Sequence, residues 1–144
     1  MTLNWTKLKK TKSPKIVGTL LQVNLPKIGV KGLIAKVDTG AYSGSLHADD
    51  IKEVVTGKAK QLQFTPHDKS TSVIVDNYHS RTVKSSNGHR STRYAIETEV
   101  EIIGKRYPIT ITLSDRSSMK YPMLIGRKFL RTHGFLVDVS INNK

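Results

Sequence analysis

The stretch Leu33-Ile34-Ala35-Lys36-Val37-Asp38-Thr39-Gly40-Ala41 decides the fold that we predict for this chain. A run of strand-forming residues ends at one carboxylate, which is followed by a hydroxyl, a residue without a side chain and a very small residue. Because glycine adopts backbone angles that other residues avoid, the amides that follow Asp38 can approach its carboxylate closely. The pattern predicts a strand that presents Asp38 at a tight turn. An Asx turn that closes an ordinary hairpin is the alternative interpretation of the same residues.

The length and composition predict one domain with a core of its own. The chain has 144 residues and contains no apolar run of about 18 residues, so we expect no membrane span. The absence of cysteine excludes disulfides, thiol catalysis and thiolate zinc sites. Because Met1-Thr2-Leu3-Asn4-Trp5 lacks the apolar segment of a signal peptide, we expect a cytoplasmic protein.

The chain is strongly basic, with 24 Lys and Arg against 11 Asp and Glu, for a net charge of +13. Such a charge favours anionic partners and says little about the fold. The basic residues are scattered beyond Lys15, and the nine aromatic residues form no stacking platform of the kind that binds single strands. We therefore rank nucleic acid below an acidic peptide or protein as the partner.

The order of elements predicts a mostly β domain. We expect a basic arm over residues 1–15 and one domain over 16–144, with a helical piece at 49–55 and a helix at 127–133 that ends at Gly134. Strands are predicted at 16–23, 33–37, 45–48, 61–64, 73–75, 97–103, 107–113, 123–125 and 135–139.

A polar hairpin is predicted over Arg81–Ile96. Asn87-Gly88 at its centre is a strong hairpin signal, because a tight two-residue turn needs positive φ angles at both positions. The arms are polar on both sides and would bury little. The hairpin is therefore either a surface excursion or a flap that closes over a site.

A second motif, Met123-Leu124-Ile125-Gly126-Arg127-Lys128-Phe129-Leu130, stands near the end of the chain. Together with Asp-Thr-Gly-Ala, it resembles the paired signatures of the retropepsin-like aspartic proteases. The resemblance implies a mostly β fold, a closed β-barrel of the acid-protease type with one short C-terminal helix. It also implies that Gly126 lets its strand pass directly beneath the turn at Asp38. Leu124, Ile125, Gly126 and Arg127 form this structural signature.

The chain is most similar to a bacterial and archaeal branch of that fold known as ATP-dependent zinc proteases. Shared segments are Ser45–Ala48, Arg81-x-x-Lys84-Ser85-Ser86-x-Gly88 with Arg93 nearby, Thr112-Leu113-x-Asp115-Arg116, and Leu124–Arg127. This resemblance covers nearly the whole chain from residue 16. The substrate-binding residues that it implies are Ala41, Arg81, Ser85, Ser86, Gly88, Arg93 and Arg116.

Neither ATP nor zinc has a recognisable motif in this sequence, so we expect no cofactor and no metal. The phosphate-binding Gly-x-x-x-x-Gly-Lys-Ser/Thr loop and the His-Glu-x-x-His pair are both absent. The five histidines show no ligand spacing: His47, His67, His79, His89 and His133. Tyr42 and Ser43 replace acidic residues of viral retropepsins, which leaves the partner of Arg127 open among Asp49, Asp50 and Asp115.

The resemblance implies aspartic proteolysis, which needs two carboxylates about 3 Å apart that share one proton. The chain carries one Asp-Thr-Gly, and neither Asp115 nor Asp138 precedes a Thr/Ser-Gly. We therefore expect a homodimer with Asp38 from each subunit. By the same resemblance, Thr39 hydroxyls interlock across the two-fold axis, Gly40 amides orient the carboxylates, and the hairpin is the flap.

The substrate and two other functions stay open at this point. Relatives of this kind are often linked to glutamate-ligase systems, so the resemblance and the cations favour a Glu-rich tail, although the same cations could form an ordinary solvated surface. A non-catalytic dimeric peptide-binding module and a basic nucleic-acid-binding protein are the alternatives. A zinc hydrolase ranks below both.

Overall fold

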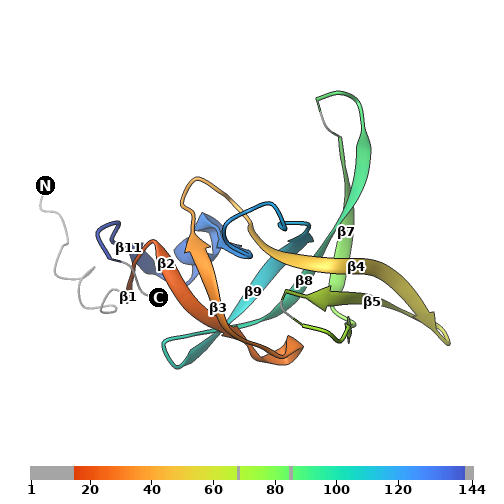
Figure 1. Ribbon diagram of the computed structural model, residues 1–144, viewed down its shortest axis with the longest axis horizontal. Helices are drawn as coiled ribbons and strands as arrows, with labels where there is room; N and C mark the ends of the chain where they lie inside the picture. Colours follow the sequence, from red (N-terminus) through yellow and green to blue (C-terminus); the bar gives the residue numbers. More distant parts are fainter. Residues whose placement is uncertain (1–14, 68, 85, 142–144) are drawn as a thin grey trace, which may run out of the picture.

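The computed structural model describes residues 15–67, 69–84 and 86–141, and strands dominate it (Figure 1). In chain order the elements are β1 (Lys15–Val17), β2 (Leu20–Leu25), the 3-10 helix η1 (Pro26–Ile28), β3 (Val30–Val37), β4 (Gly44–Thr56), β5 (Ala59–Pro66), β6 (Val73–Val75), β7 (Tyr78–Lys84), β8 (Arg90–Ile102), β9 (Lys105–Ser114), β10 (Met123–Ile125), α2 (Arg127–Thr132) and β11 (Phe135–Val137). Among these residues, no helix is long and apolar enough to cross a membrane.

Six strands close into a barrel in the order β10-β3-β2-β8-β9-β4. The short strand β10 closes it, because it pairs in parallel with β3 and antiparallel with β4. Closure leaves these strands without free edges. The predicted mostly β barrel with one short C-terminal helix is confirmed.

In β8 from Ile96 and in β9 from Ile109, buried residues that face the core alternate with more exposed residues. Ile96 of β8 lies directly opposite Ile111 of β9, and both are fully buried. Met123 and Ile125 of β10, which pairs with the end of β3, are also fully buried. Burying a side chain of this size stabilises the fold by about 1.5–3 kcal/mol. The core therefore fixes β10 where it can support the turn that follows β3.

The predicted helical piece at 49–55 is wrong, because β4 continues as a strand to Thr56. Residues Lys52–Thr56 pair with β5 through a turn at Gly57, whose φ is +65°. The pairing shifts register between Asp49 and Lys52, and Asp50 has a φ of +53° there. A β-bulge of this kind bends a strand without ending it. Cross-strand pairing, which local sequence does not reveal, decides the structure of this segment.

The predicted hairpin is confirmed and rises from the barrel as a long projection (Figure 1). Lys84 of β7 pairs with Arg90 of β8, so the connection between them spans five residues. Only Gly88 of the Asn-Gly pair has a positive φ, and the Asn87 side-chain oxygen accepts a hydrogen bond from the His89 amide at 3.1 Å. The two-residue turn that we predicted is therefore wrong in detail. Ser85 lies outside the described residues.

The two ends of the described chain form a separate parallel pair, β1 with β11. Lys15, which we assigned to the basic arm, begins β1, and its ammonium group donates a hydrogen bond to the His133 carbonyl at 3.0 Å. The same group lies 4.9 Å from the centroid of the Tyr107 ring. Residues 1–14 of the predicted arm lie outside the described residues.

Candidate active site

Asp38 stands directly after β3 in a turn held by backbone hydrogen bonds. Its amide donates to the Ile125 carbonyl of β10 at 2.9 Å, and the Ala41 amide donates back to the Asp38 carbonyl at 3.2 Å. The Gly40 amide donates to the Asp38 carboxylate at 2.9 Å. A Cβ at Gly40 would lie only 3.2 Å from that carboxylate oxygen, so glycine leaves room for the approach. The turn thus fixes one carboxylate oxygen.

The turn lies at the surface of the single chain. Thr39 and Gly40 are exposed, and Asp38 is half-buried. The two carboxylates that we compared with Asp38 in the sequence each bind a nearby serine. Asp115 accepts a hydrogen bond from the Ser117 hydroxyl and Asp138 accepts one from the Ser140 hydroxyl, each at 2.6 Å. These hydrogen bonds lower the pKa of both groups.

Gly126 lies directly against the backbone of the loop that follows the turn. A Cβ at Gly126 would lie 2.5 Å from the Tyr42 carbonyl oxygen and 2.7 Å from the Ser43 carbonyl carbon. The backbone of the loop after the turn therefore rests directly on this residue. The Arg127 amide, at the start of α2, donates to the Ala41 carbonyl at 2.8 Å. Leu124 and Ile125 pair with Lys36 and Val37 at the end of β3.

The partner of Arg127 is none of the three carboxylates considered from the sequence. Its guanidinium donates to the Gly40 carbonyl at 3.0 Å and lies 5.4 Å from the centroid of the Tyr42 ring. An aromatic face attracts a guanidinium as a carboxylate does, although more weakly. Arg127 therefore contacts the Gly40 carbonyl and the Tyr42 ring in place of a carboxylate.

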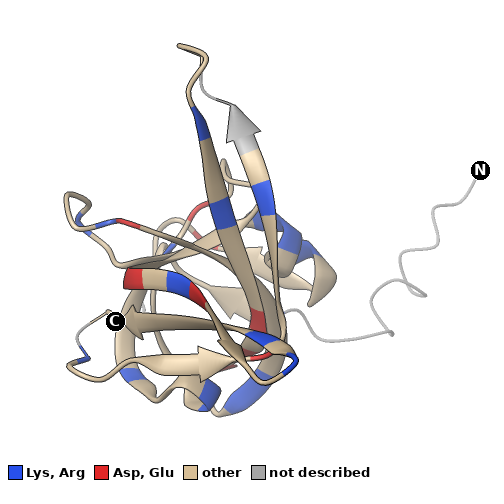
Figure 2. Ribbon diagram, turned by 90° about the vertical axis from the view of Figure 1, so that its right-hand side faces the viewer, with Lys and Arg blue, Asp and Glu red and all other residues tan. Residues whose placement is uncertain are grey.

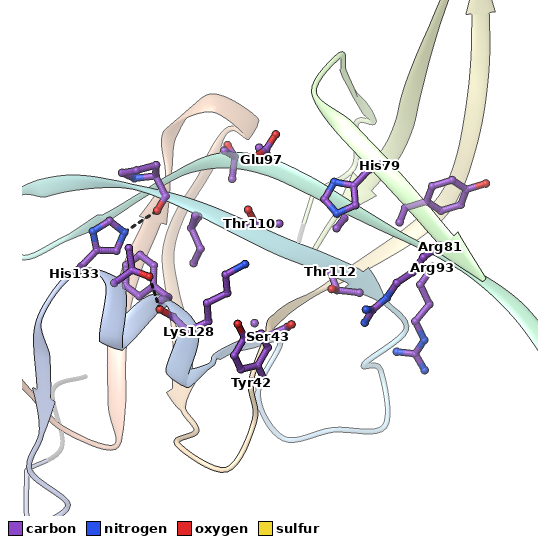
Figure 3. Close-up of a pocket in the computed structure, with 18 residues that line it drawn as sticks. Tyr42, Ser43, His79, Arg81, Arg93, Glu97, Thr110, Thr112, Lys128 and His133 are labelled. Carbon is purple, nitrogen blue, oxygen red and sulfur yellow. Dashed lines mark hydrogen bonds between the residues drawn. The ribbon is translucent and has the colours of Figure 1, made fainter. Parts of the chain in front are cut away.

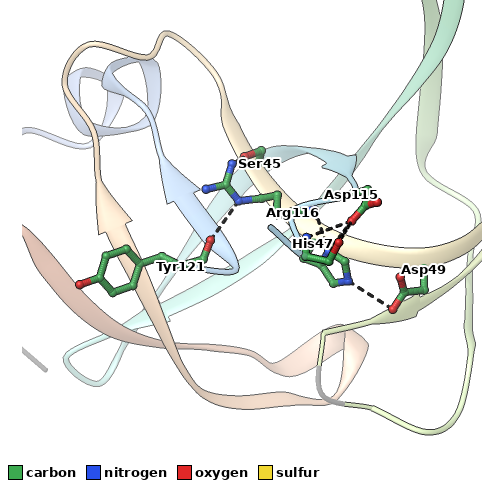
Figure 4. Close-up of polar contacts among 7 residues, drawn as sticks. Ser45, His47, Asp49, Asp115, Arg116 and Tyr121 are labelled. Carbon is green, nitrogen blue, oxygen red and sulfur yellow. Dashed lines mark hydrogen bonds and ion pairs between the residues drawn. The ribbon is translucent and has the colours of Figure 1, made fainter. Parts of the chain in front are cut away.

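Arg116 is anchored beside the site by three contacts (Figure 4). Its guanidinium donates to the Ser45 hydroxyl at 3.2 Å and to the Tyr121 carbonyl at 3.1 Å. Partial burial lowers the pKa of Arg116, and the negative charge of Asp38 acts in the opposite direction. These two contacts use two of the five N–H donors of the guanidinium and leave three for a substrate.

His47 holds the loop that carries Arg116. The residue is 6% exposed, and Nδ1 of its ring accepts a hydrogen bond from the Arg116 amide at 2.8 Å. Since Nδ1 is an acceptor, Nε2 carries the proton and donates to the Asp49 carboxylate at 3.2 Å. The Asp115 carboxylate lies 3.7 Å from Nδ1. His47, which lies in β4 as Asp49 does, therefore joins this strand to the loop that follows β9.

Replacement of this buried ring should destabilise the protein measurably. His47→Leu leaves the Arg116 amide without its acceptor, so we expect the free energy of unfolding to fall by about 1–3 kcal/mol. Urea unfolding followed by circular dichroism measures this change. The exposed His79 provides the control, and His79→Leu should change the unfolding free energy by less than about 0.5 kcal/mol. Equal stability of the two variants would contradict the role of His47.

A cavity of about 560 Å³ lies between the base of the hairpin, the loop after the turn and α2 (Figure 3). Arg81 and Arg93, both predicted to bind substrate, line it. Arg116 does not line it, and Ser86 and Gly88 lie in the connection at the far end of the hairpin. Of the predicted substrate-binding residues that the structure describes, only Arg81 and Arg93 therefore line this cavity. Ala41, which is half-buried, lies in the turn.

Several residues that line the cavity were not predicted from the sequence. Thr110 and Thr112 of β9 line the cavity, whereas Ile111 and Leu113 alternate with them and are buried in the core. This alternation could have assigned both threonines to one face. Other missed lining residues are Tyr42, Ser43, His79, Glu97, Lys128 and His133, whose approach depends on the fold. Among the described residues, no three His, Cys, Asp or Glu side chains gather closely enough to hold a metal ion.

The closed barrel, the Asp-Thr-Gly turn resting on Gly126 and the short helix after it define a retropepsin-like fold. Comparison with known proteins agrees. Residues 16–143 match the RimB-like family, described as "Retropepsin-like aspartic endopeptidase RimB", and the chain belongs to this family.

Curated relatives and a solved structure cover the same region. The chain is 32% identical to a "Probable alpha-L-glutamate ligase" of Desulfotalea psychrophila over 79% of its own length and 26% of the relative. A protein of the same name from Shewanella pealeana is also 32% identical, over 87% of this chain and 28% of the relative. The chain thus spans about a quarter of these relatives. A crystal structure of a Legionella pneumophila protein with unknown function superposes with a TM-score of 0.74 at 27% identity, covering 92% of this chain and 98% of that one.

Proposed function

We propose that this protein is an aspartic-type peptide-bond hydrolase that acts as a homodimer with one catalytic Asp38 per chain. The observation that carries the proposal is the exposed turn at Asp38, whose carboxylate accepts the Gly40 amide at 2.9 Å. A two-fold axis beside this turn would pair the same surface of two subunits and bring the two carboxylates together. The exposed Thr39 would then lie in the interface.

In the proposed mechanism the two Asp38 carboxylates share one proton, because both cannot ionise at about 3 Å. The ionised carboxylate removes a proton from water, and the water oxygen attacks the peptide carbonyl carbon. The protonated carboxylic acid donates a hydrogen bond to the carbonyl oxygen, on which negative charge develops. Transfer of a proton to the amine then allows the C–N bond to break. The hairpin of β7 and β8 serves as the flap that excludes water from this site.

We propose that the substrate is an acidic, Glu-rich protein tail. The net charge of +13 attracts an anionic chain, and basic residues lie on both strands of the projecting hairpin (Figure 2). The name of the curated relatives, "Probable alpha-L-glutamate ligase", supports a link to glutamate, although this chain matches only about a quarter of them.

The dimer requirement makes the specific activity depend on concentration. As the protein is diluted below the dimer dissociation constant, we expect the specific activity to fall in parallel with the dimer fraction. Cleavage of a Glu-rich peptide, combined with sedimentation velocity across the same concentrations, measures both quantities. Full specific activity in samples that sediment as monomers would contradict a shared site.

A further inference from the structure

Two arginines face one another midway along the hairpin. Arg81 of β7 and Arg93 of β8 are direct cross-strand partners, and both line the cavity. Figure 3 shows the two side chains extending from the hairpin in the same direction. Like charges in directly opposite positions destabilise a strand pair. The pair therefore costs stability when the cavity is empty.

No group of the protein offsets this repulsion in the part of the chain that the structure describes. Neither guanidinium has an ion-pair or hydrogen-bond partner there. Glu97 also lines the cavity, but it lies four residues beyond Arg93 on the same strand, which is about 13 Å along an extended chain. An anion between the two arginines would therefore meet uncompensated positive charge.

The opposite wall of the cavity also suits an anion. Lys128 of α2 lines it, as does Ser43 in the loop after the catalytic turn. The lysine ammonium lies 5.9 Å from the centroid of the Tyr42 ring, and like the two arginines it has no ion pair among the described residues. Ser43 belongs to the loop that follows the turn, and Asp38 itself does not line the cavity.

We propose that Arg81 and Arg93 form a carboxylate subsite, which binds an acidic side chain of the substrate at a position removed from the cleaved bond. The planar forks of two arginines can each donate two parallel hydrogen bonds to a carboxylate. Lys128 and the Ser43 hydroxyl add a positive charge and a donor to the opposite wall of the same cavity. The inference rests on the proposed function, because the subsite serves the same cleft.

Two-fold symmetry gives this subsite a consequence for cleavage. A homodimer carries two identical subsites, one on each side of the shared carboxylates. A substrate that fills both must present acidic residues before and after the cleaved bond. The enzyme therefore cuts inside an acidic run, and it cuts poorly at the junction between that run and a neutral segment.

Binding to an inactive variant tests the subsite apart from catalysis. The probe is a fluorescent hexa-L-glutamate peptide titrated with Asp38→Asn protein that carries Arg81→Gln, Arg93→Gln or neither. We expect each arginine variant to weaken binding about tenfold, as for loss of a charge-assisted hydrogen bond. Arg90→Gln is the matched control, since Arg90 lies on the same strand but an odd number of residues from Arg93, and therefore on the other face. Equal effects of all three changes, or none, would overturn the subsite.

Cleavage by protein that retains Asp38 then tests whether acidic residues are needed on both sides of the cleaved bond. Three peptides of equal length carry four glutamates before the central bond, after it, or two on each side. We expect the symmetric peptide to be cleaved with the highest kcat/KM, and Arg93→Gln to raise its KM more than it lowers kcat. Equal cleavage of all three would overturn the two-sided requirement. If no peptide is cleaved but hexaglutamate binding still depends on Arg81 and Arg93, the subsite stands and the proposed hydrolase fails.

Discussion

Asp38→Asn is expected to reduce peptide cleavage by about 10⁴-fold, at the upper end of what general acid–base catalysis contributes. An amide cannot share a proton with its partner, so neither the base nor the acid of the dyad remains. The amide oxygen can still accept the Gly40 hydrogen bond, which keeps the turn in place. Initial rates with a Glu-rich peptide, measured from acid to neutral pH, give the loss.

The control for this prediction is Asp115→Asn. Asp115 is an exposed carboxylate whose oxygen accepts hydrogen bonds from the Ser117 hydroxyl and amide. We expect this variant to keep its activity within a few-fold of wild type and to lose a little stability. Cleavage that survives Asp38→Asn and disappears with a metal chelator would instead establish a zinc-dependent reaction and contradict the aspartic mechanism.

Gly126→Ala is expected to damage both the fold and the site. Its Cβ would lie within 2.8 Å of three backbone atoms of Tyr42 and Ser43, a separation that packed atoms do not reach. Backbone cannot rotate away as a flexible side chain can, so the loop after Asp38 must move. We expect the free energy of unfolding to fall by about 3 kcal/mol, at the upper end for overpacking. A shift of about 1 Å in the turn would lower kcat about 10²-fold in addition.

Gly44→Ala is a milder substitution with which the loss of stability in Gly126→Ala can be compared. A Cβ at Gly44 would approach one backbone atom closely, the Leu124 carbonyl oxygen at 2.8 Å. We expect a smaller loss of unfolding free energy than for Gly126→Ala, measured by urea unfolding of both variants. A Gly126→Ala protein as stable and as active as wild type would show that the turn does not rest on this glycine as described.

The parts of the fold that local chemistry determines could be predicted from the sequence. The turn at Asp38 and the helix that follows Gly126 depend on short patterns of glycine, carboxylate and apolar residues. The hairpin could be located from Asn87-Gly88, although its five-residue connection could not. The segment at 49–55 was predicted as a helix because its pairing with β5 is not visible in its own residues.

The contacts around the site depend on residues far apart in the chain. His47 bonds an amide 69 residues away, and Arg127 bonds a carbonyl 87 residues away. No spacing rule connects such pairs before the strands are placed. The lining of the cavity also depends on residues far apart in the chain, because Lys128 lines it together with hairpin residues only once α2 packs near the hairpin. Arginine chemistry suggested an anionic substrate, whereas the direct pairing of Arg81 with Arg93 required the strand register.

The most direct test of the central claim is a mixing experiment, because the claim is that two Asp38 carboxylates act together. Wild-type protein is unfolded and refolded with an equal amount of Asp38→Asn protein, and cleavage is compared with that of the same wild-type amount refolded alone. Random pairing leaves about half of the wild-type chains in wild-type dimers. The account predicts that activity falls to about half and falls further with excess mutant. Activity that depends only on the amount of wild-type protein would contradict it.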